Sequence, residues 1–440
     1  MPAAARGPTP APEISRGSLT IAALSTIVEW YDFTLYLYFA TVLSRVFFGG
    51  GDLSLLATLA GFAVSYFMRP LGALVFGHIG DRFGRRRTLL LSMALMTAAM
   101  LATALLPAYG SLGATAGVLL LVLRCLMAFS VGGEYTSVVA YLLEGAPPGR
   151  RGLVTSLASA ASEVGALLAV AVSAATVALL DTPQLDAWGW RIPFFLRAAL
   201  AGRIWIARSA MQESPDFERQ QRQGTIPASP ILHTLTHHRV AVLRTFAISA
   251  LGSITYYVGI TYVPAFLTSA GGRAEGESLW LSTVAAVAVI VVTPAAGALS
   301  DHLGRRRMLI GLAILGAALP QFMFTYMAHG TTAQVVLGAV ALALVAGGVS
   351  AVGAPATAEQ FPGEGRLSGL ALGATAATAL FGGLTPFLAE WLVQATGWTA
   401  APGAMIALVA LAVLPVLRGL PETVPRAARE RATPPTRSSR

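Results

Sequence analysis

The chain contains no lysine, no asparagine, a single cysteine and few charged residues. All thirty basic residues are arginine, which we attribute to biased base composition rather than to function. The lone Cys125 excludes a disulfide bond within one chain. Charged residues make up only 12% of the 440 residues, whereas soluble domains carry about 25%. The shortage of charge therefore argues against a soluble globular protein.

Signature motifs of several function classes are also missing. The sequence shows no soluble catalytic domain, phosphate-binding loop, nucleophile motif or metal-binding cluster, so we expect neither an enzyme nor a cofactor. His233 and His237 have a spacing that can hold a metal on a helix, but no acidic residue lies between them. We interpret both as solvated linker residues. The arginine clusters lack a folded soluble domain to present them, so nucleic acid is not an expected partner.

Apolar residues are abundant: 55% of the chain is hydrophobic and the mean hydropathy is +0.67. A helix needs ~20 apolar residues to cross a bilayer, and the chain offers twelve such stretches. No long alternating pattern suggests a barrel, so we predict an all-α membrane protein. The expected spans are residues 19–44, 53–76, 88–107, 113–143, 152–180, 190–208, 239–268, 278–299, 308–328, 333–357, 366–393 and 400–420.

The arginine residues indicate the orientation of these spans. Most lie in one set of loops and in the two tails, and only Arg45, Arg191 and Arg273 are expected on the other side. The positive-inside rule then puts both termini in the cytoplasm of a multi-pass cell-membrane protein. The expected organisation is a cytoplasmic tail at 1–18, a six-helix bundle at 19–208, a cytoplasmic linker at 209–238, a second bundle at 239–420 and a disordered basic tail at 421–440.

Two short motifs occur twice, once in each half of the chain. A basic turn is repeated after 220 residues, and a Glu–Arg pair is repeated after 215. Two motifs that recur at nearly the same shift indicate a duplicated half, a construction that many transporters use. The motif residues are Gly77, Asp81, Arg82, Gly84 and Arg85, repeated with Asp301, Gly304 and Arg305, together with Glu144 and Arg151, repeated as Glu359 and Arg366.

The fixed frame of the basic turn predicts a conformational latch built from these motif residues. Its glycines let two helices approach closely, and its aspartate lies at the cytoplasmic end of a span. Asp81 or Asp301 can meet a helix N-terminus, or an arginine of the neighbouring turn, and be stabilised there. Such contacts can hold one conformation and release it in another. Plain anchoring by positive charge is the alternative, and it explains the arginines but not the Gly–Asp–Gly frame.

This frame resembles the signature of the major facilitator superfamily, and the resemblance covers the whole chain. Within it, Val28-Glu29-Trp30-Tyr31-Asp32-Phe33, Gly132-Gly133-Glu134-Tyr135 and Glu213-Ser-Pro215-Asp-Phe217 resemble motifs of the metabolite:proton symporters. The resemblance implies twelve helices in two pseudo-symmetric six-helix bundles, a monomer, and proton-coupled import of a small organic solute by alternating access. Arg197 and Arg203 depart from the family, which is mostly apolar in that span.

Ionisable residues inside the expected spans are candidates for proton coupling, because a charge in a span is costly. The acids are Glu29, Asp32, Glu134 and Glu163, and we expect Arg69 and Arg124 as their bases. Since four acids face two bases, at least one acid is expected to take up and release the proton. A permanent ion pair of Arg69 with Glu29 or Asp32 that only fixes helix packing is the alternative.

Arginine and tyrosine side chains are the candidate substrate ligands. Arg69 and Arg124 suit a carboxylate, and tyrosine faces suit a quaternary ammonium by cation–π contact. A betaine or proline carries both groups, so import of a zwitterion is the predicted function, with a di- or tricarboxylate as the alternative. An efflux antiporter is less favoured because residues 152–180 contain no proline, and a sensor that binds without transport stays open. The tyrosines are Tyr36, Tyr256, Tyr257 and Tyr262.

Overall fold

The computed structural model describes residues 14–50, 52–147, 149–273 and 275–423. These residues form helices and no strand, as expected for backbone in lipid, where every N–H and C=O must be paired within the segment. The expected tails before residue 14 and after residue 423 lie outside the described residues.

The first half contains six membrane-crossing segments, two of them built from two helices. They are α1, α3 with α4, α5, α7 with α8, α9, and α11. The elements of this half are α1 (Arg16–Tyr38), α2 (Ala40–Phe48), α3 (Asp52–Tyr66), α4 (Met68–Phe83), α5 (Arg85–Leu105), α6 (Tyr109–Leu112), α7 (Thr115–Gly132), α8 (Glu134–Gly145), α9 (Arg151–Leu179), α10 (Thr182–Gln184), η1 (Leu185–Gly189) and α11 (Arg191–Ser209).

Two short helices, α12 (Pro215–Gln223) and α13 (Pro230–His237), form the linker to six further segments. Two of these segments contain π-helical turns, labelled η. The second half consists of α14 (Arg239–Tyr256) with η2 (Tyr257–Thr261) and α15 (Val263–Ser269), α16 (Glu275–Leu303), α17 (Arg305–His329), α18 (Thr332–Ala358), α19 (Arg366–Leu370) with η3 (Ala371–Thr375), α20 (Ala376–Thr378), η4 (Ala379–Gly383) and α21 (Thr385–Thr396), and α22 (Ala401–Arg418).

Nine helical segments of the described chain are long and apolar enough to cross a membrane by length and composition alone. The three other segments carry charge or are interrupted. Glu29 and Asp32 reduce the hydropathy of α1, four arginines reduce that of α11, and α3 and α4 are separated at Phe67. Most of these charges lie inside the bundle, as described below, which reconciles them with a membrane position.

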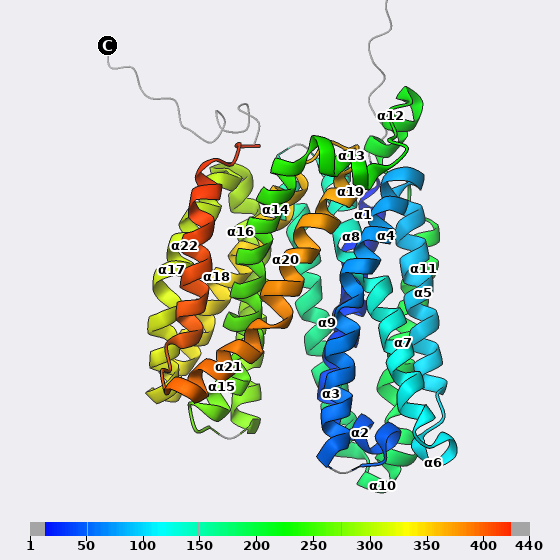
Figure 1. The fold of residues 1–440 in the computed structure, drawn as a ribbon, viewed down its shortest axis with the longest axis vertical. Coiled ribbons are helices and arrows are strands. Elements are labelled where there is room, and N and C mark those ends of the chain that lie inside the picture. The colour runs from blue at the N-terminus through cyan, green and yellow to red at the C-terminus, as the bar shows by residue number, and fades with distance from the viewer. Residues whose placement is uncertain (1–13, 51, 148, 274, 424–440) are drawn as a thin grey trace, which may run out of the picture.

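The two halves form adjacent helical bundles (Figure 1). The turns at Gly84 and Gly304 and the linker helices α12 and α13 lie at one end, which we call the Arg-rich end. The described chain also starts and stops at that end, whereas α2, α6 and α10 lie at the opposite end. The even number of crossings in each half accounts for this arrangement.

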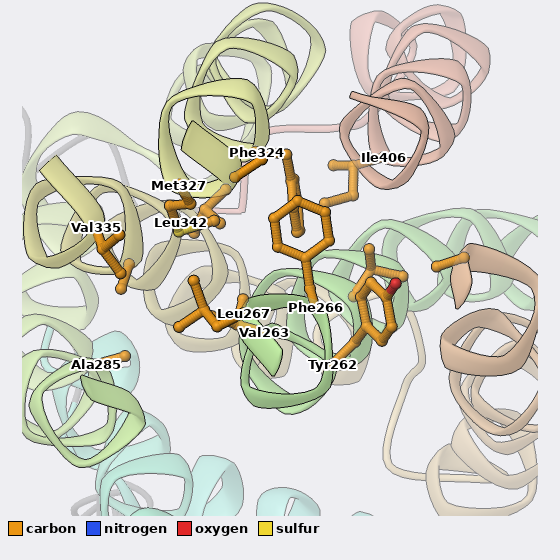
Figure 2. Packing of buried hydrophobic residues seen from close by; sticks show 14 of the residues in the cluster. Tyr262, Val263, Phe266, Leu267, Ala285, Phe324, Met327, Val335, Leu342 and Ile406 are labelled. Atoms are coloured by element: carbon orange, nitrogen blue, oxygen red, sulfur yellow. The ribbon is translucent and has the colours of Figure 1, made fainter. Parts of the chain in front are cut away.

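Tight side-chain packing stabilises each half, since association in lipid depends on van der Waals contact more than on the hydrophobic effect. In the second half, the rings of Phe266 and Phe324 meet edge to face at 4.9 Å, surrounded by Met327, Leu342 and Ile406 (Figure 2). In the first half, Trp190 packs between Phe47 and Phe194 at 5.0 and 5.7 Å. These two aromatic clusters fix helices from different parts of each half.

Glycines allow backbones to touch at two crossings near the candidate sites. A Cβ atom on Gly72 would overlap the carbonyl of Phe129, and one on Gly132 would overlap the carbonyl of Arg69, so α4 and α7 lie in direct backbone contact. Gly152 of α9 and Gly297 of α16 meet in the same way across the two halves. The first crossing fixes the backbone of Arg69, and the second brings the two halves together.

Two expected boundaries were wrong. Helix α1 begins at Arg16, inside the expected tail. The expected span 113–143 corresponds to one membrane-capable segment, Thr115–Gly145, with a break between α7 and α8 at Gly133. The segment Pro421–Thr423, expected to be disordered, is bound to the helices. Glu422 accepts a hydrogen bond of 2.8 Å from the backbone N–H of Arg305, and Thr423 bonds to Glu359. The first N–H groups of α17 have no partner within their own helix. They donate to Glu422 and so bind the segment that follows α22.

Candidate functional site

A cavity of about 210 Å³ lies between the two halves. It is lined by α1, α4, α7, α8 and α9 of the first half and by α14, α16, α18 and the α19–η3 segment of the second. Small and hydroxyl side chains form most of its wall. Its charged and aromatic lining residues are Glu29, Trp30, Arg69, Tyr135, Glu163, Tyr256 and Tyr257.

Among the described residues that line the cavity, Arg69 is the one with a basic side chain. Its Nη1 lies 3.8 Å from Oε1 of Glu29, and its guanidinium lies 4.7 Å from the ring centre of Tyr66 and 5.3 Å from that of Phe33. Glu29 is buried, and the separation of 3.8 Å is longer than a normal hydrogen bond. Arg69 and Glu29 therefore form an ion pair without a close hydrogen bond.

Two adjacent tyrosines of the second half bond to the first half across the cavity. The hydroxyl of Tyr256 donates to Oε1 of Glu163, and the hydroxyl of Tyr257 pairs with that of Tyr66 at 2.7 Å. Both tyrosines lie where α14 passes into the π-helical turn η2, a local irregularity that is frequent at functional sites. Trp30 packs edge-on against Tyr256 at 5.4 Å, which completes an aromatic wall.

Asp32 and Glu134 do not line the cavity but take part in buried ion pairs. Asp32 lies 2.5 Å from Arg124 and also contacts Arg197, while Glu134 contacts Arg208. The count of two bases was therefore wrong, because α11 supplies Arg197 and Arg208. An arginine inside an apolar span needs a buried acid, and that rule was the available signal for both.

Three of the predicted substrate ligands lie outside the cavity lining. Arg124 bonds to Asp32 and lies 4.4 Å over the ring of Tyr36, whose hydroxyl donates to the carbonyl of Thr58 at 3.1 Å. Tyr262 is buried in the core of the second half, as Figure 2 shows, and donates to Glu390 at 2.6 Å. Since each is engaged elsewhere, we do not carry these three residues forward as substrate ligands.

At the Arg-rich end, the aspartate of the first basic turn bonds to the second half. Asp81 accepts hydrogen bonds from the backbone N–H groups of Leu367 at 3.2 Å and Ser368 at 2.8 Å, at the start of α19. Arg85 lies 3.4 Å from Asp81 and 3.1 Å from Glu144. All these groups are buried, so the carboxylates and the guanidinium compensate one another.

The aspartate of the second basic turn bonds to the first half in the same manner. Asp301 accepts from the backbone N–H groups of Gly152 at 2.8 Å and Leu153 at 3.0 Å, at the start of α9. Arg305 lies 2.7 Å from Asp301 and 3.5 Å from Glu359. Each half therefore caps a helix of the other with a carboxylate, which is favourable at a helix N-terminus.

The Glu–Arg pairs and the linker extend this network. Arg366 bonds to Glu144 at 2.6 Å and to Asp216 at 3.0 Å. Arg82 donates to the carbonyl of Ala228 at 3.1 Å. Arg151, by contrast, is exposed. The predicted latch residues thus come together at the Arg-rich end, with Arg151 at the margin.

The glycines of the basic turns have two different roles in the structure. Gly84 and Gly304 adopt φ angles of 111° and 97°, which favour glycine. A Cβ on Gly77 would lie 3.2 Å from the carbonyl oxygen of Leu367, so α4 approaches α19 closely. Gly77 thus lets the first turn approach the opposite half, whereas Gly84 and Gly304 leave room for the side chains of Glu213 and Glu422.

Two glutamates that our sequence analysis did not assign also cap helices at these turns. Glu213 accepts from the backbone N–H groups of Arg85 at 2.9 Å and Arg86 at 3.1 Å, and Glu422 occupies the matching place on α17. Burial raises the pKa of Glu213, an effect that the backbone N–H groups partly offset. Burial also acts to raise the pKa of Asp216, but the ion pairs with Arg366 and Arg219 outweigh it and hold that pKa below its usual value.

The comparisons with known proteins agree with this architecture. The family model described as "Sugar (and other) transporter" matches residues 18–239, and the one described as "Major Facilitator Superfamily" matches residues 272–439. The fold is similar to that of the proton:xylose symporter XylE, with a TM-score of 0.75 at 21% identity over 92% of this chain and 96% of that one.

Curated relatives are more similar in sequence. The glycine betaine/proline/ectoine/pipecolic acid transporter OusA of Dickeya dadantii is 32% identical over 92% of this chain and 82% of its own length. The citrate-proton symporter of Klebsiella pneumoniae is 31% identical over 90% and 89%, and the alpha-ketoglutarate permease of Escherichia coli is 32% identical over 84% and 85%. The protein is therefore a membrane transporter that belongs to the major facilitator superfamily and, within it, to the metabolite:proton symporters.

Proposed function

We propose that this transporter imports a small zwitterion of the betaine or proline type together with protons, by alternating access around the central cavity. The lining of the cavity supports this substrate class, because Arg69 and Glu29 offer opposite charges within a wall of aromatic rings. The substrates named for the OusA relative belong to the same chemical class.

Arg69 is the proposed ligand of the substrate carboxylate. Its long contact to Glu29 leaves donors of the guanidinium available for a bidentate bond. Trp30, Tyr256 and Tyr257 then lie around the substituted ammonium group, where cation–π contacts contribute about 0.5–2 kcal/mol each. Glu29 balances the positive end of the substrate. A zwitterion thus finds complementary charge at both of its ends.

The cavity is less suited to a tricarboxylate, although relatives carry citrate or α-ketoglutarate as their names state. Among the described lining residues, a single arginine faces two glutamates. Several substrate carboxylates would meet these acids without enough cations to compensate them, and like charges at close range are destabilising. We therefore rank polycarboxylate uptake second.

The Arg-rich end is proposed to face the cytoplasm, in accord with the positive-inside rule. The hydrogen bonds of Asp81 and Asp301 join the halves at that end, so the described state is closed toward the cytoplasm. Import requires this end to open. The network of basic turns, Glu–Arg pairs and helix caps is accordingly proposed to act as the latch that closes again after substrate release.

Competition uptake in proteoliposomes tests the proposal. Purified protein is reconstituted with an acidic exterior, and accumulation of labelled glycine betaine is measured against excess proline, citrate and α-ketoglutarate. We expect proline and unlabelled betaine to compete and a protonophore to abolish accumulation. Inhibition by citrate alone would assign the runner-up class, and uptake that persists with a protonophore but requires sodium would refute proton coupling.

A further inference from the structure

Among the described residues, Glu163 differs from Glu29, Asp32 and Glu134 in the kind of partner that it has. Asp32 contacts Arg124 and Arg197, Glu134 contacts Arg208, and Glu29 lies near Arg69. Within the described residues, Glu163 has no basic group within 4.0 Å. Its carboxylate bonds to the hydroxyl of Tyr256, which belongs to the opposite half.

Few charged groups face Glu163 from the surrounding helices. Helix α9 packs against α1, α8, α11, α16 and α18. Around the cavity, α1 presents Glu29, α8 presents Tyr135, α14 presents Tyr256, η2 presents Tyr257, and α4 presents Arg69. The described residues of α11, α16 and α18 contribute no ionisable side chain to the lining. Glu163 is 3% exposed and borders the cavity, so a proton can reach it from the space that the substrate enters.

We infer that Glu163 is the proton-carrying residue of the transport cycle, and that its bond to Tyr256 is the contact through which the proton controls movement of the two halves. This inference rests on the proposed proton-coupled function and assigns the residues that perform it. Asp32 and Glu134 are each in contact with arginine side chains, and Glu29 lies beside Arg69 at the substrate site.

Charge on Glu163 determines the strength of this contact. When the carboxylate is ionised, the Tyr256 hydroxyl donates a charge-assisted bond, roughly twice as strong as a bond between neutral groups. The ionised protein is therefore held in the described state. One proton from the outer solution binds to Glu163 and neutralises it, while Tyr256 keeps its own proton. The weakened contact lets the substrate-loaded halves separate at the Arg-rich end, and the proton leaves Glu163 to the other side.

This order prevents movement of substrate without a proton, which is the requirement for symport. A substrate that enters while Glu163 is ionised meets a protein still locked by Tyr256. The pair Tyr66–Tyr257 also crosses the cavity, but it joins two hydroxyls and no carboxylate. It holds the halves without sensing the proton, and it supplies a matched control.

The test separates coupling from transport in proteoliposomes with the membrane potential clamped. Labelled glycine betaine is used, or the solute that wild-type protein accumulates if that is another one. With one proton per neutral solute, a gradient of one pH unit supports about tenfold accumulation. In Glu163→Gln we expect no accumulation, so that the solute concentrations inside and outside the vesicles become equal. The rate of solute exchange at equal pH should stay within about threefold of the wild-type rate.

Two further variants test the contact itself. Tyr256→Phe should permit solute movement without matching proton movement, seen with a pH-sensitive dye in the vesicle lumen, and should reduce the accumulation ratio severalfold. Tyr66→Phe should retain the wild-type ratio of protons to solute. Gradient-driven accumulation by Glu163→Gln, or equal loss of exchange and accumulation, would overturn the role of Glu163. Full coupling in Tyr256→Phe would overturn the role of the contact. Failure of the wild-type protein to use a pH gradient would instead refute the proposed function.

Discussion

Asp81 accepts a hydrogen bond of 2.8 Å from the backbone N–H of Ser368, although 287 residues separate the two in the chain. The bond joins the first basic turn to the start of α19, and a second bond to Leu367 makes the contact bidentate. Because both groups are buried and one is charged, the contact is stronger than a neutral bond. We therefore expect this contact and its counterpart at Asp301 to separate when the Arg-rich end opens.

Asp81→Asn should slow transport by about tenfold or more and leave substrate binding nearly unchanged. The change removes the charge that caps α19, about 1.5–3 kcal/mol for a charged hydrogen bond, at a site remote from the cavity. Uptake rates and equilibrium binding are measured on the same preparation. Asp181→Asn is the control, because Asp181 caps α10 within one half, at 2.8 Å from the N–H of Gln184. Normal turnover in Asp81→Asn would reduce the basic turn to an anchor.

Arg69→Lys should raise the KM for glycine betaine by about tenfold, since lysine cannot bind a carboxylate in bidentate geometry. Choline, which has the quaternary ammonium but no carboxylate, should inhibit the variant and the wild type equally. Arg45→Lys is the matched control, because Arg45 pairs with Asp186 at the opposite end of the molecule, at 2.8 Å. An equal change for betaine and choline would show that Arg69 does not bind the carboxylate.

Asp32→Asn should destabilise the protein rather than uncouple it. The variant leaves the buried guanidinium groups of Arg124 and Arg197 without their carboxylate, and loss of one partner of a buried ion pair costs about 3–5 kcal/mol. The measurement is thermal unfolding in detergent. Glu163→Gln, which breaks no ion pair, should unfold near the wild-type temperature. An unchanged Tm in Asp32→Asn would contradict the packing role.

The His238→Gln variant should lose less thermal stability than the wild-type protein when the pH falls. Burial, with the neighbouring His233 and His237, lowers the pKa of His238 below its usual 6.5. The folded protein then binds fewer protons at this site than the unfolded chain. Its contribution to stability is full above pH 6.5 and is lost as the pH falls through that range. Tm is compared between pH 8 and pH 5, with Gln223→Ala as a non-titrating linker control. Parallel curves for all three proteins would contradict the prediction.

Single-cysteine labelling should find the linker in the cytoplasm. With Cys125 replaced by alanine, Gln223→Cys places a thiol in the exposed linker and Ser111→Cys places one at the opposite end. A membrane-impermeant maleimide added to intact cells should label the second variant alone, and lysis should expose the first. The reverse labelling would invert the proposed topology.

The sequence was sufficient to predict the helices and to indicate which motif residues gather at the Arg-rich end, because both depend on local chemistry. A carboxylate next to a helix N-terminus is favourable wherever the chain brings them together, and the duplication indicated where to look. The three residues Pro421–Thr423 were mispredicted, since proline content suggests disorder while the capping partner Arg305 lies 117 positions from Glu422. Such a partner becomes visible only in the fold.

The roles of the buried acids were much harder to predict. Glu29 and Asp32 are three residues apart on α1, yet Glu29 lines the cavity and Asp32 points to Arg124 and Arg197. A helix that is apolar on most of its surface gives no local indication of its rotation about its axis. Packing against neighbouring helices determines that rotation. Tyr262 shows the same limit, because residue type alone could not place it against Glu390.

The reciprocal caps at the Arg-rich end have the geometry of a two-fold interface. Asp81 meets the start of α19, and its repeat Asp301 meets the start of α9, which is the repeat of α19. In an isologous dimer, a residue on one subunit contacts a second residue on the other, and the reverse contact follows by symmetry. Two identical half-length chains could form a dimer through these same contacts, because one aspartate and one helix start per chain would supply both of them. The single chain thus has the contact pattern of an isologous interface, although the two halves that form it differ in sequence.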